Sequence, residues 1–254
     1  MPPCNLEDLY LESSRNVNVS STTCMEAWNA FLSAFSGKDP STVTQENYDS
    51  YFQVLPIFVV RNHALFWSGT FALAQGISSI DPSICSSFTE PSAASVSGVG
   101  EENECWCGNA NSPGVDCVNE CNGVPVTQFW VSFSTMLGQR AEGVVFWLAW
   151  GERAGGTYQS NSFFAENEFS ALEYPRVSRL VVLNVHNRGM GESCGEGTLR
   201  ILEALSEAKF GASGYMCYDV YGDASLMDMA VVRNIVYIIN VEQSGECICI
   251  NTSL

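Results

Sequence analysis

The sequence predicts a mixed α/β fold, with a helical first half and a small parallel sheet in the last third of the chain. Apolar residues recur at helical spacing near the N-terminus, and β-branched runs alternate with a helical pattern towards the C-terminus. With 254 residues, 46% of them hydrophobic, the chain is long enough for one large domain or two small ones that share an interface.

An apolar stripe that ends before Gly37 predicts the first helix. The members of the stripe are Cys24, Trp28, Phe31, Leu32 and Phe35. The run Asn62–Trp67 is short and largely apolar, and Ser68-Gly69 follows it, so we expect a buried strand. The segment Asp81–Pro125 is rich in Ser, Gly, Asn, Pro and Cys, which indicates a loop or hairpin held by disulfides.

The last third alternates between strand and helix patterns. Arg179–Val185 is a β-branched run that predicts a strand, and Thr198–Phe210 has the apolar spacing of a helix. Tyr215–Val220 and Val231–Asn240 are predicted as further strands. Such an alternation favours parallel strands with crossover helices.

A glycine-rich segment, His186–Gly195, lies between the predicted strand and helix and is superficially like a dinucleotide-binding turn. The third glycine of that pattern would fall at Cys194, so the spacing fails. We therefore predict no Rossmann site here.

Charged residues make up 15% of the chain and are mostly acidic, which gives a net charge of -17. Such a surface repels phosphate backbones, so nucleic acid is not an expected partner, and a nucleotide pocket must depend on local contacts. The opening MPPCNLEDLY has no basic or apolar region of a signal peptide, and apolar runs such as Ile235–Ile239 are too short to span a bilayer. We expect a mature or trimmed soluble form.

Eleven cysteines and two sequons, at Asn18 and Asn251, favour a secreted glycoprotein with a disulfide framework. A zinc site is the alternative, but the paired cysteines are separated by a single residue and only His63 and His186 are present to complete a site. We therefore expect disulfides and no metal. Both histidines lack obvious partners and are interpreted as structural or surface residues.

Six short motifs occur in an order and spacing that covers most of the chain. They are Cys24-Met-Glu-Ala-Trp28-Asn-Ala-Phe31, Leu65-Phe66-Trp67-Ser68-Gly69, Trp106-Cys107-Gly108, Phe129-Trp130, Ala141-Glu142-Gly143 and Ser162-Phe163-Phe164-x-x-x-Glu168. Together they resemble the ADP-ribosyl cyclase family, and in detail its molluscan members more closely than its mammalian ones.

The resemblance implies an α/β protein of two lobes, with a helical N-terminal lobe and a C-terminal lobe that contains a four-stranded parallel sheet flanked by helices. Residues 1–59 and 90–141 would form the helical lobe. Residues 60–89 and 142–254 would form the parallel-sheet lobe, with the active cleft between the two.

The resemblance also implies three disulfides. They are Cys4–Cys24, Cys107–Cys117 and Cys194–Cys217. The usual family partner of Cys121 is replaced by Ser41, and Asn240 replaces one member of the last family pair. The pairing of the remaining cysteines is therefore left open; they are Cys85, Cys105, Cys121, Cys247 and Cys249.

By resemblance, Glu168 is the catalytic carboxylate, and Trp67 and Trp130 are the walls of the cleft. The other tryptophans are interpreted as core residues; they are Trp28, Trp106, Trp147 and Trp150. The nicotinamide of NAD leaves as a neutral ring, so its bond to ribose needs no general acid, and one carboxylate that stabilises the developing ribose cation suffices. Flat indole faces are suited to stacking on nicotinamide and to steering the adenine end of the substrate.

Further substrate contacts follow from the same resemblance. Ser68 and Ser134 match positions that contact phosphate, and the backbone of Phe163 and Phe164 is expected to do the same. A bulky Phe163 favours cyclisation over hydrolysis by excluding water.

The family's Thr-Leu-Glu-Asp signature is displaced here, and Glu90 is its nearest acidic equivalent, expected to contact nicotinamide. Glu102 is a candidate for a second acidic pocket residue. Both glutamates are equally consistent with solvated loops.

The predicted function is therefore cleavage of the nicotinamide–ribose bond of NAD, through an oxocarbenium-like intermediate, to cyclic ADP-ribose, ADP-ribose or both. The alternatives are a nearly pure NAD glycohydrolase and a catalytically inactive secreted binding protein. The resemblance implies no cofactor besides the NAD substrate and allows a homodimer. The cysteines and sequons favour a location outside the cell or in the lumen of a secretory vesicle, and membrane anchoring of the precursor is left open.

Overall fold

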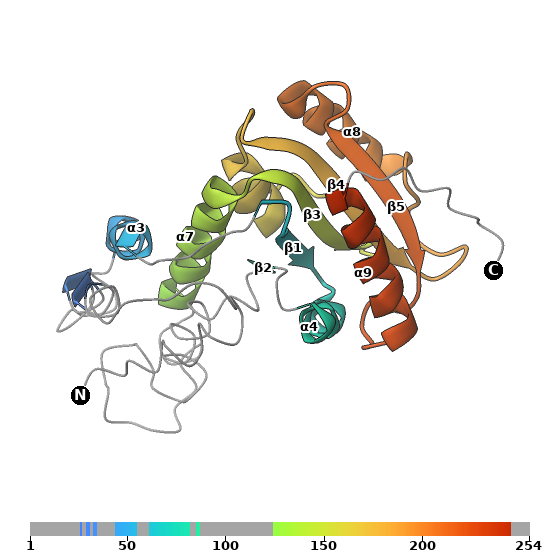
Figure 1. Ribbon diagram of the computed structural model, residues 1–254, viewed down its shortest axis with the longest axis horizontal. Coiled ribbons are helices and arrows are strands. Elements are labelled where there is room, and N and C mark those ends of the chain that lie inside the picture. Colours follow the sequence, from blue (N-terminus) through green and yellow to red (C-terminus); the bar gives the residue numbers. More distant parts are fainter. Residues whose placement is uncertain are drawn as a thin grey trace. The chain divides into compact units, whose positions relative to one another are not determined.

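The structure is a computed structural model that describes residues 44–54, 61–81, 85–86 and 124–244 (Figure 1). It also describes five positions of the first predicted helix, which are 26, 29, 30, 33 and 34, and all five are helical. The rest of that helix and most of the predicted Asp81–Pro125 loop lie outside the described residues.

Residue contacts divide the chain into two compact units. Unit 1 comprises residues 1–58, 87–140 and 166–171, and unit 2 comprises residues 59–86, 141–165 and 172–254. Besides the helical positions between residues 26 and 34, unit 1 contains the described helices α3 (Gln45–Val54) and α7 (Val124–Arg140), which contact each other. A π-helical segment, η2 (Phe164–Phe169), begins in unit 2 and ends in unit 1.

Unit 2 is built on a parallel sheet with the strand order β2-β1-β3-β4-β5. The strands are β1 (Ala64–Ser68), β2 (Cys85–Ser86), β3 (Gly143–Trp150), β4 (Val177–His186) and β5 (Tyr215–Tyr221). All four neighbouring pairs are parallel. The four longer strands confirm the predicted four-stranded parallel sheet, and the two-residue β2 adds a short edge.

Three of those strands coincide with predicted ones, whereas the central strand β3 was not recognised in the sequence. Its run GVVFWLAW is apolar throughout, because both faces of a central parallel strand are covered, and such a run carries no alternation. Strand β3 pairs with β1 on one side and with β4 on the other, so it fixes the middle of the sheet.

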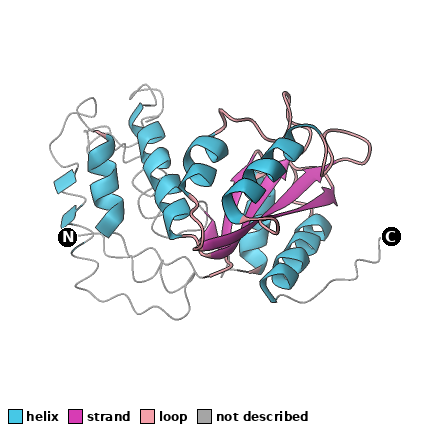
Figure 2. Cartoon of the chain, turned by 90° about the horizontal axis from the view of Figure 1, so that it is seen from above, coloured by secondary structure: helices cyan, strands magenta, loops and turns pink. Residues whose placement is uncertain are grey.

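Three helices cover the sheet; they are α4 (Phe71–Ile80), α8 (Gly197–Phe210) and α9 (Met229–Ser244) (Figures 1 and 2). Helices α4 and α9 share one buried apolar cluster with residues of β1, β3, β4 and β5. The two helices approach closely at Gly76, where an added Cβ would lie 2.7 Å from a methyl group of Val232. Helix α8 contacts β4 and β5 but contributes no residue to that cluster, and lies on the opposite face.

The prediction of a strand over Val231–Asn240 is wrong, since these residues lie in helix α9. The buried residues are Val231, Val232, Ile235, Val236, Ile238 and Ile239, which is the spacing of a helical face. Asp228 begins the helix, because its carboxylate accepts a hydrogen bond from the amide of Ala230 at 2.8 Å. Burial among apolar neighbours outweighs the modest preference of β-branched residues for strands.

No helix among the described residues has the length and apolar character needed to cross a membrane.

Candidate functional site

The carboxyl group of Glu168 is buried on a helical segment that runs from residue 163 to 171, with η2 at its centre. Glu168 is 4% exposed, and the hydroxyl of Ser134 on α7 donates a hydrogen bond to its carboxylate. Burial raises the pKa of Glu168 to about 8, and the bond from Ser134 opposes that rise. A carboxylate with this pKa is half ionised slightly above neutral pH, which is typical of functional sites.

The close approach of α7 to Glu168 depends on Gly138, one turn after Ser134. A Cβ atom added at Gly138 would lie 2.8 Å from the backbone oxygen of Glu168 and 2.9 Å from the Cβ of Ala171. Trp130 lies one turn before Ser134 on α7. Positions one turn apart share a face of a helix, so α7 places 130, 134 and 138 along one line.

Trp67 and Ser68 end strand β1 in unit 2. The indole Nε1 of Trp67 is buried and has no hydrogen-bond partner among the described residues, and its ring lies 5.6 Å from that of Phe71. Trp147 donates a hydrogen bond from Nε1 to the Ser68 hydroxyl oxygen at 3.3 Å. The Ser68 oxygen is thus used as an acceptor, which leaves its O–H to donate to an anion such as a phosphate oxygen.

The two phenylalanines before Glu168 have different surroundings. Phe163 is 41% exposed, whereas Phe164 is fully buried and stacks on Trp147 with ring centroids 4.2 Å apart. The stack confirms that Trp147 is a core residue. Trp150 is 39% exposed, so its prediction as a core residue is wrong: it is the last residue of β3, and its ring lies close to Gly69, which has no side chain to cover it.

The candidate residues belong to both units. Glu168, Ser134 and Trp130 lie in unit 1, and Trp67, Ser68, Phe163 and Phe164 lie in unit 2. Glu90 and Glu102 lie outside the described residues. A single cleft that these residues line stays a prediction.

The predicted disulfide Cys194–Cys217 is confirmed, with its Cα atoms 5.7 Å apart. It connects the loop after β4 to strand β5. The other predicted half-cystines lie outside the described residues; they are Cys4, Cys24, Cys107 and Cys117.

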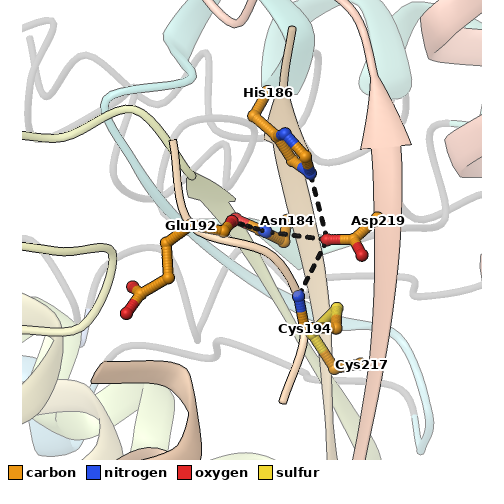
Figure 3. Close-up of a disulfide and its surroundings, with 6 residues drawn as sticks. All are labelled: Asn184, His186, Glu192, Cys194, Cys217 and Asp219. Atoms are coloured by element: carbon orange, nitrogen blue, oxygen red, sulfur yellow. Dashed lines mark hydrogen bonds and ion pairs between the residues drawn. A yellow bond between two sulfur atoms is a disulfide. The ribbon is translucent and has the colours of Figure 1, made fainter. Parts of the chain in front are cut away.

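A polar cluster surrounds this disulfide (Figure 3). One oxygen of Asp219, Oδ1, accepts hydrogen bonds from the side-chain amide of Asn184 at 2.9 Å and from the backbone amide of Cys194 at 3.0 Å. The same oxygen lies 3.0 Å from Nε2 of His186, which is 2% exposed.

His186 is therefore a buried structural residue, as one of the two interpretations had it, and it has a partner that was not obvious in the sequence. The partner, Asp219, lies 33 residues away along the chain but on the neighbouring strand, where Asn184 pairs with Asp219. The available signal was that polar residues end two parallel strands, whose carboxyl ends meet at one edge of the sheet. His63 is half-buried. Within the described part of the chain, no group of His, Cys, Asp or Glu side chains is arranged to hold a metal ion.

Comparison with known proteins identifies relatives over most of the chain. The family model of ADP-ribosyl cyclase matches residues 9–233. Human ADP-ribosyl cyclase/cyclic ADP-ribose hydrolase 2 is 26% identical over 212 residues, which cover 80% of this chain and 64% of that protein, so the chain spans less than two thirds of its length. The Aplysia californica ADP-ribosyl cyclase/cyclic ADP-ribose hydrolase is 27% identical over 227 residues, which cover 82% of this chain and 78% of that protein.

Solved structures have the same fold. The crystal structure of Aplysia cyclase complexed with substrate NGD and product cGDPR superposes with a TM-score of 0.63, at 21% identity, and covers 98% of this chain and 99% of that one. The apo structure of porcine CD38 superposes with a TM-score of 0.62, at 20% identity, and covers 85% of this chain and 94% of that one.

Proposed function

The chain belongs to the ADP-ribosyl cyclase family, and on that premise we propose that it cleaves the nicotinamide–ribose bond of NAD and forms cyclic ADP-ribose, ADP-ribose or both. The names of its relatives, which combine cyclase with cyclic ADP-ribose hydrolase, support this substrate class. The observation that carries the proposal is the buried carboxyl group of Glu168, hydrogen-bonded to Ser134 and with a raised pKa, in a motif that resembles the one around the family's catalytic glutamate.

Glu168 acts in this proposal by stabilising positive charge. As the bond to nicotinamide breaks, the departing ring takes the bonding electron pair and becomes neutral, and the ribose carbon becomes an oxocarbenium-like cation. A carboxylate held in a poorly solvated position interacts with that cation more strongly than it would in water. No proton has to be delivered to the leaving group, so a second carboxylate acting as general acid is not required.

The other proposed residues contact different parts of the substrate. Trp67 and Trp130 stack on nicotinamide, and Ser68 donates its hydroxyl hydrogen to a phosphate oxygen. The exposed ring of Phe163 excludes water from the cation and favours cyclisation. Phe164 has its side chain in the core, so its proposed contribution is limited to the backbone.

The test is the substitution Glu168→Gln, with nicotinamide release from NAD as the readout. We expect a loss of about 100-fold or more, because a neutral amide cannot stabilise the cation. Glu166→Gln is the matched control, since Glu166 is an exposed acid two residues earlier on the same helical segment. Retention of more than about a tenth of wild-type turnover by a folded Glu168→Gln variant would count against the proposal.

Two assays separate the alternatives to a cyclase. The NAD analogue with guanine in place of adenine gives a fluorescent cyclic product, whose absence alongside nicotinamide release would indicate a nearly pure glycohydrolase. Absence of nicotinamide release at micromolar protein would indicate an inactive binding protein. Unchanged turnover after exhaustive chelation is expected if the reaction needs no cofactor, and sedimentation tests whether the chain forms the homodimer that the resemblance allows.

We also propose that the protein is secreted or lies in the lumen of a secretory vesicle. The Cys194–Cys217 disulfide supports this location, because such bonds persist in oxidising compartments.

A further inference from the structure

The segment 151–162 joins the end of β3 to the helical segment that carries Phe163 and Glu168. Its first residues are held at the end of β4. The amide of Gly151 donates to the carbonyl of Val185 at 2.8 Å, and the carboxylate of Glu152 accepts hydrogen bonds from the backbone and side chain of Asn187. This segment therefore sets where the proposed catalytic helix begins.

The middle of the segment is held by a single side chain, the carboxylate of Glu192. One oxygen accepts a hydrogen bond from the amide of Thr157 at 2.8 Å and another from the hydroxyl of Thr198 at 2.6 Å. The other oxygen accepts a hydrogen bond from the backbone amide of Thr198, in the first turn of α8. The amide of Tyr158 in turn donates to the Thr198 hydroxyl oxygen at 2.9 Å. Two consecutive buried residues, Thr157 and Tyr158, are thus tied to the start of α8.

Two glycines make this close approach of backbones possible. Gly156 has φ +98°, and a Cβ added there would lie 2.4 Å from the methyl group of Thr198. Gly191 has φ +74°, and its added Cβ would lie 2.5 Å from the carbonyl oxygen of Gly151. The sequence thus has glycine at the points where the loop after β3 meets the loop after β4 and the start of α8.

Packing connects the Glu192 carboxylate to the start of η2. The ring of Tyr158 lies edge-on to Trp147 with centroids 6.4 Å apart, and Trp147 stacks on Phe164, the first residue of η2. Because these rings are close-packed, a displacement of Tyr158 is transmitted to the helical segment.

We propose that Glu192 is a positioning residue for the NAD-cleaving reaction: its carboxylate fastens residues 157 and 158 to the first turn of α8 and so fixes the helix that carries Phe163 and Glu168. The inference rests on the proposed function and adds a residue that does not itself touch the substrate.

The charge of Glu192 suits this role. Burial alone raises its pKa, but the hydrogen bonds from Thr198 and Thr157 lower it more, so the pKa lies below its ordinary value. The carboxylate is therefore ionised at neutral pH. It also lies at the N-terminus of α8, where negative charge is favoured by the helix dipole.

The test compares Glu192→Gln with Glu196→Gln. Gln has one acceptor oxygen, so it cannot accept all three hydrogen bonds: with that oxygen facing Thr157 and the Thr198 hydroxyl, its NH2 group faces the backbone N–H of Thr198, donor against donor. Glu196 is an exposed acid at the same end of α8, and its side chain makes no capping hydrogen bond. We expect Glu192→Gln to lose about tenfold or more in kcat, because misplacement of about 1 Å costs on the order of 100-fold. KM should change little, and Glu196→Gln should behave like the wild type.

A second readout separates positioning from loss of folded protein. The ratio of cyclic to linear product is independent of how many molecules are folded, and we expect Glu192→Gln to shift it towards the linear product. Hydrogen exchange at the amides of Thr157 and Tyr158 should accelerate in the same variant. Thr198→Val is the milder companion variant, and its effect on kcat should not add to that of Glu192→Gln, because both break one network.

The outcomes distinguish this inference from the proposed function. Wild-type protein that releases no nicotinamide refutes the proposed function and the positioning role with it. The positioning role alone is overturned if the wild type is active and Glu192→Gln shows accelerated hydrogen exchange but an unchanged kcat and an unchanged product ratio. An equal loss of kcat in Glu196→Gln also overturns it, since the effect would then be one of charge.

Discussion

The substitution Ser134→Ala should move the pH dependence of NAD cleavage towards higher pH. Glu168 acts as an anion in the proposed reaction, and its pKa of about 8 means that the active form gains population as pH rises through that value. The ratio kcat/KM reports the free enzyme, so its midpoint should lie near this pKa. The Ser134 hydroxyl stabilises the anion, and without it the pKa rises further.

The size of the shift follows from the strength of that hydrogen bond. A bond to a charged group contributes about 1.5–3 kcal/mol, and one pKa unit corresponds to about 1.4 kcal/mol, so the midpoint should rise by about 1 to 2 pH units. Below the midpoint, kcat/KM is proportional to the ionised fraction, so at neutral pH Ser134→Ala should lose about tenfold or more. At a pH well above the new midpoint the variant should regain most of its activity.

The assay is nicotinamide release measured from pH 5 to pH 10 at substrate concentrations well below KM. Ser132→Ala is the control, because Ser132 is an equally buried serine on α7 whose hydroxyl oxygen accepts from Gln45 instead. Its midpoint should coincide with that of the wild type. A wild-type profile that is flat between pH 6 and pH 9, or a Ser134→Ala midpoint that has not moved, would refute the link between Glu168, its burial and the proposed chemistry.

Two further predictions concern the same carboxyl group. The pKa of Glu168 is about 8 in the folded chain and 4.5 for an ordinary Glu, so the native state holds the extra proton, and the free energy of unfolding should fall as pH rises between these values, by up to about 1.4 kcal/mol per unit. Urea unfolding at pH 5, 7 and 9 should show a flatter dependence for Glu168→Gln, and equal slopes would contradict the burial argument. Gly138→Val should displace the Glu168 backbone and lower both kcat and thermal stability, whereas Gln139→Val, at the next and exposed position of α7, should leave kcat unchanged.

The parts of the fold that the sequence predicted are those with local signals. Strand β4 has a β-branched run, helix α8 has the apolar spacing of a helix, and the motif around Glu168 has fixed spacing. Helix α9 was predicted as a strand because a buried helix rich in Val and Ile has the composition of a strand. Only the spacing of its buried residues distinguishes such a helix from a strand. Strand β3 was missed because complete burial removes the alternation that identifies a strand.

The polar interactions of the site are the least predictable part. The contact between His186 and Asp219 depends on which strands are neighbours, and the bonds of Glu192 to Thr157 depend on two loops meeting. The raised pKa of Glu168 depends on how closely α7 packs on it, which is set by a glycine on another helix. The His186–Asp219 contact leaves only the signal that polar residues end two parallel strands, and the other pairings leave no pattern in the sequence around either member.

The wider turn of η2 has a consequence for how this segment tolerates insertions and deletions. A π-helix contains one residue more per turn than the α-helix it interrupts. Removing one residue between Phe164 and Glu168 would let the segment close into regular α-helix. Because the wider turn takes up the additional residue, the side chains after it would keep nearly the same direction, and the Glu168 carboxylate would still face Ser134. A single-codon deletion here should therefore be tolerated better than one in the middle of α7, where every later side chain would rotate by about 100° about the helix axis.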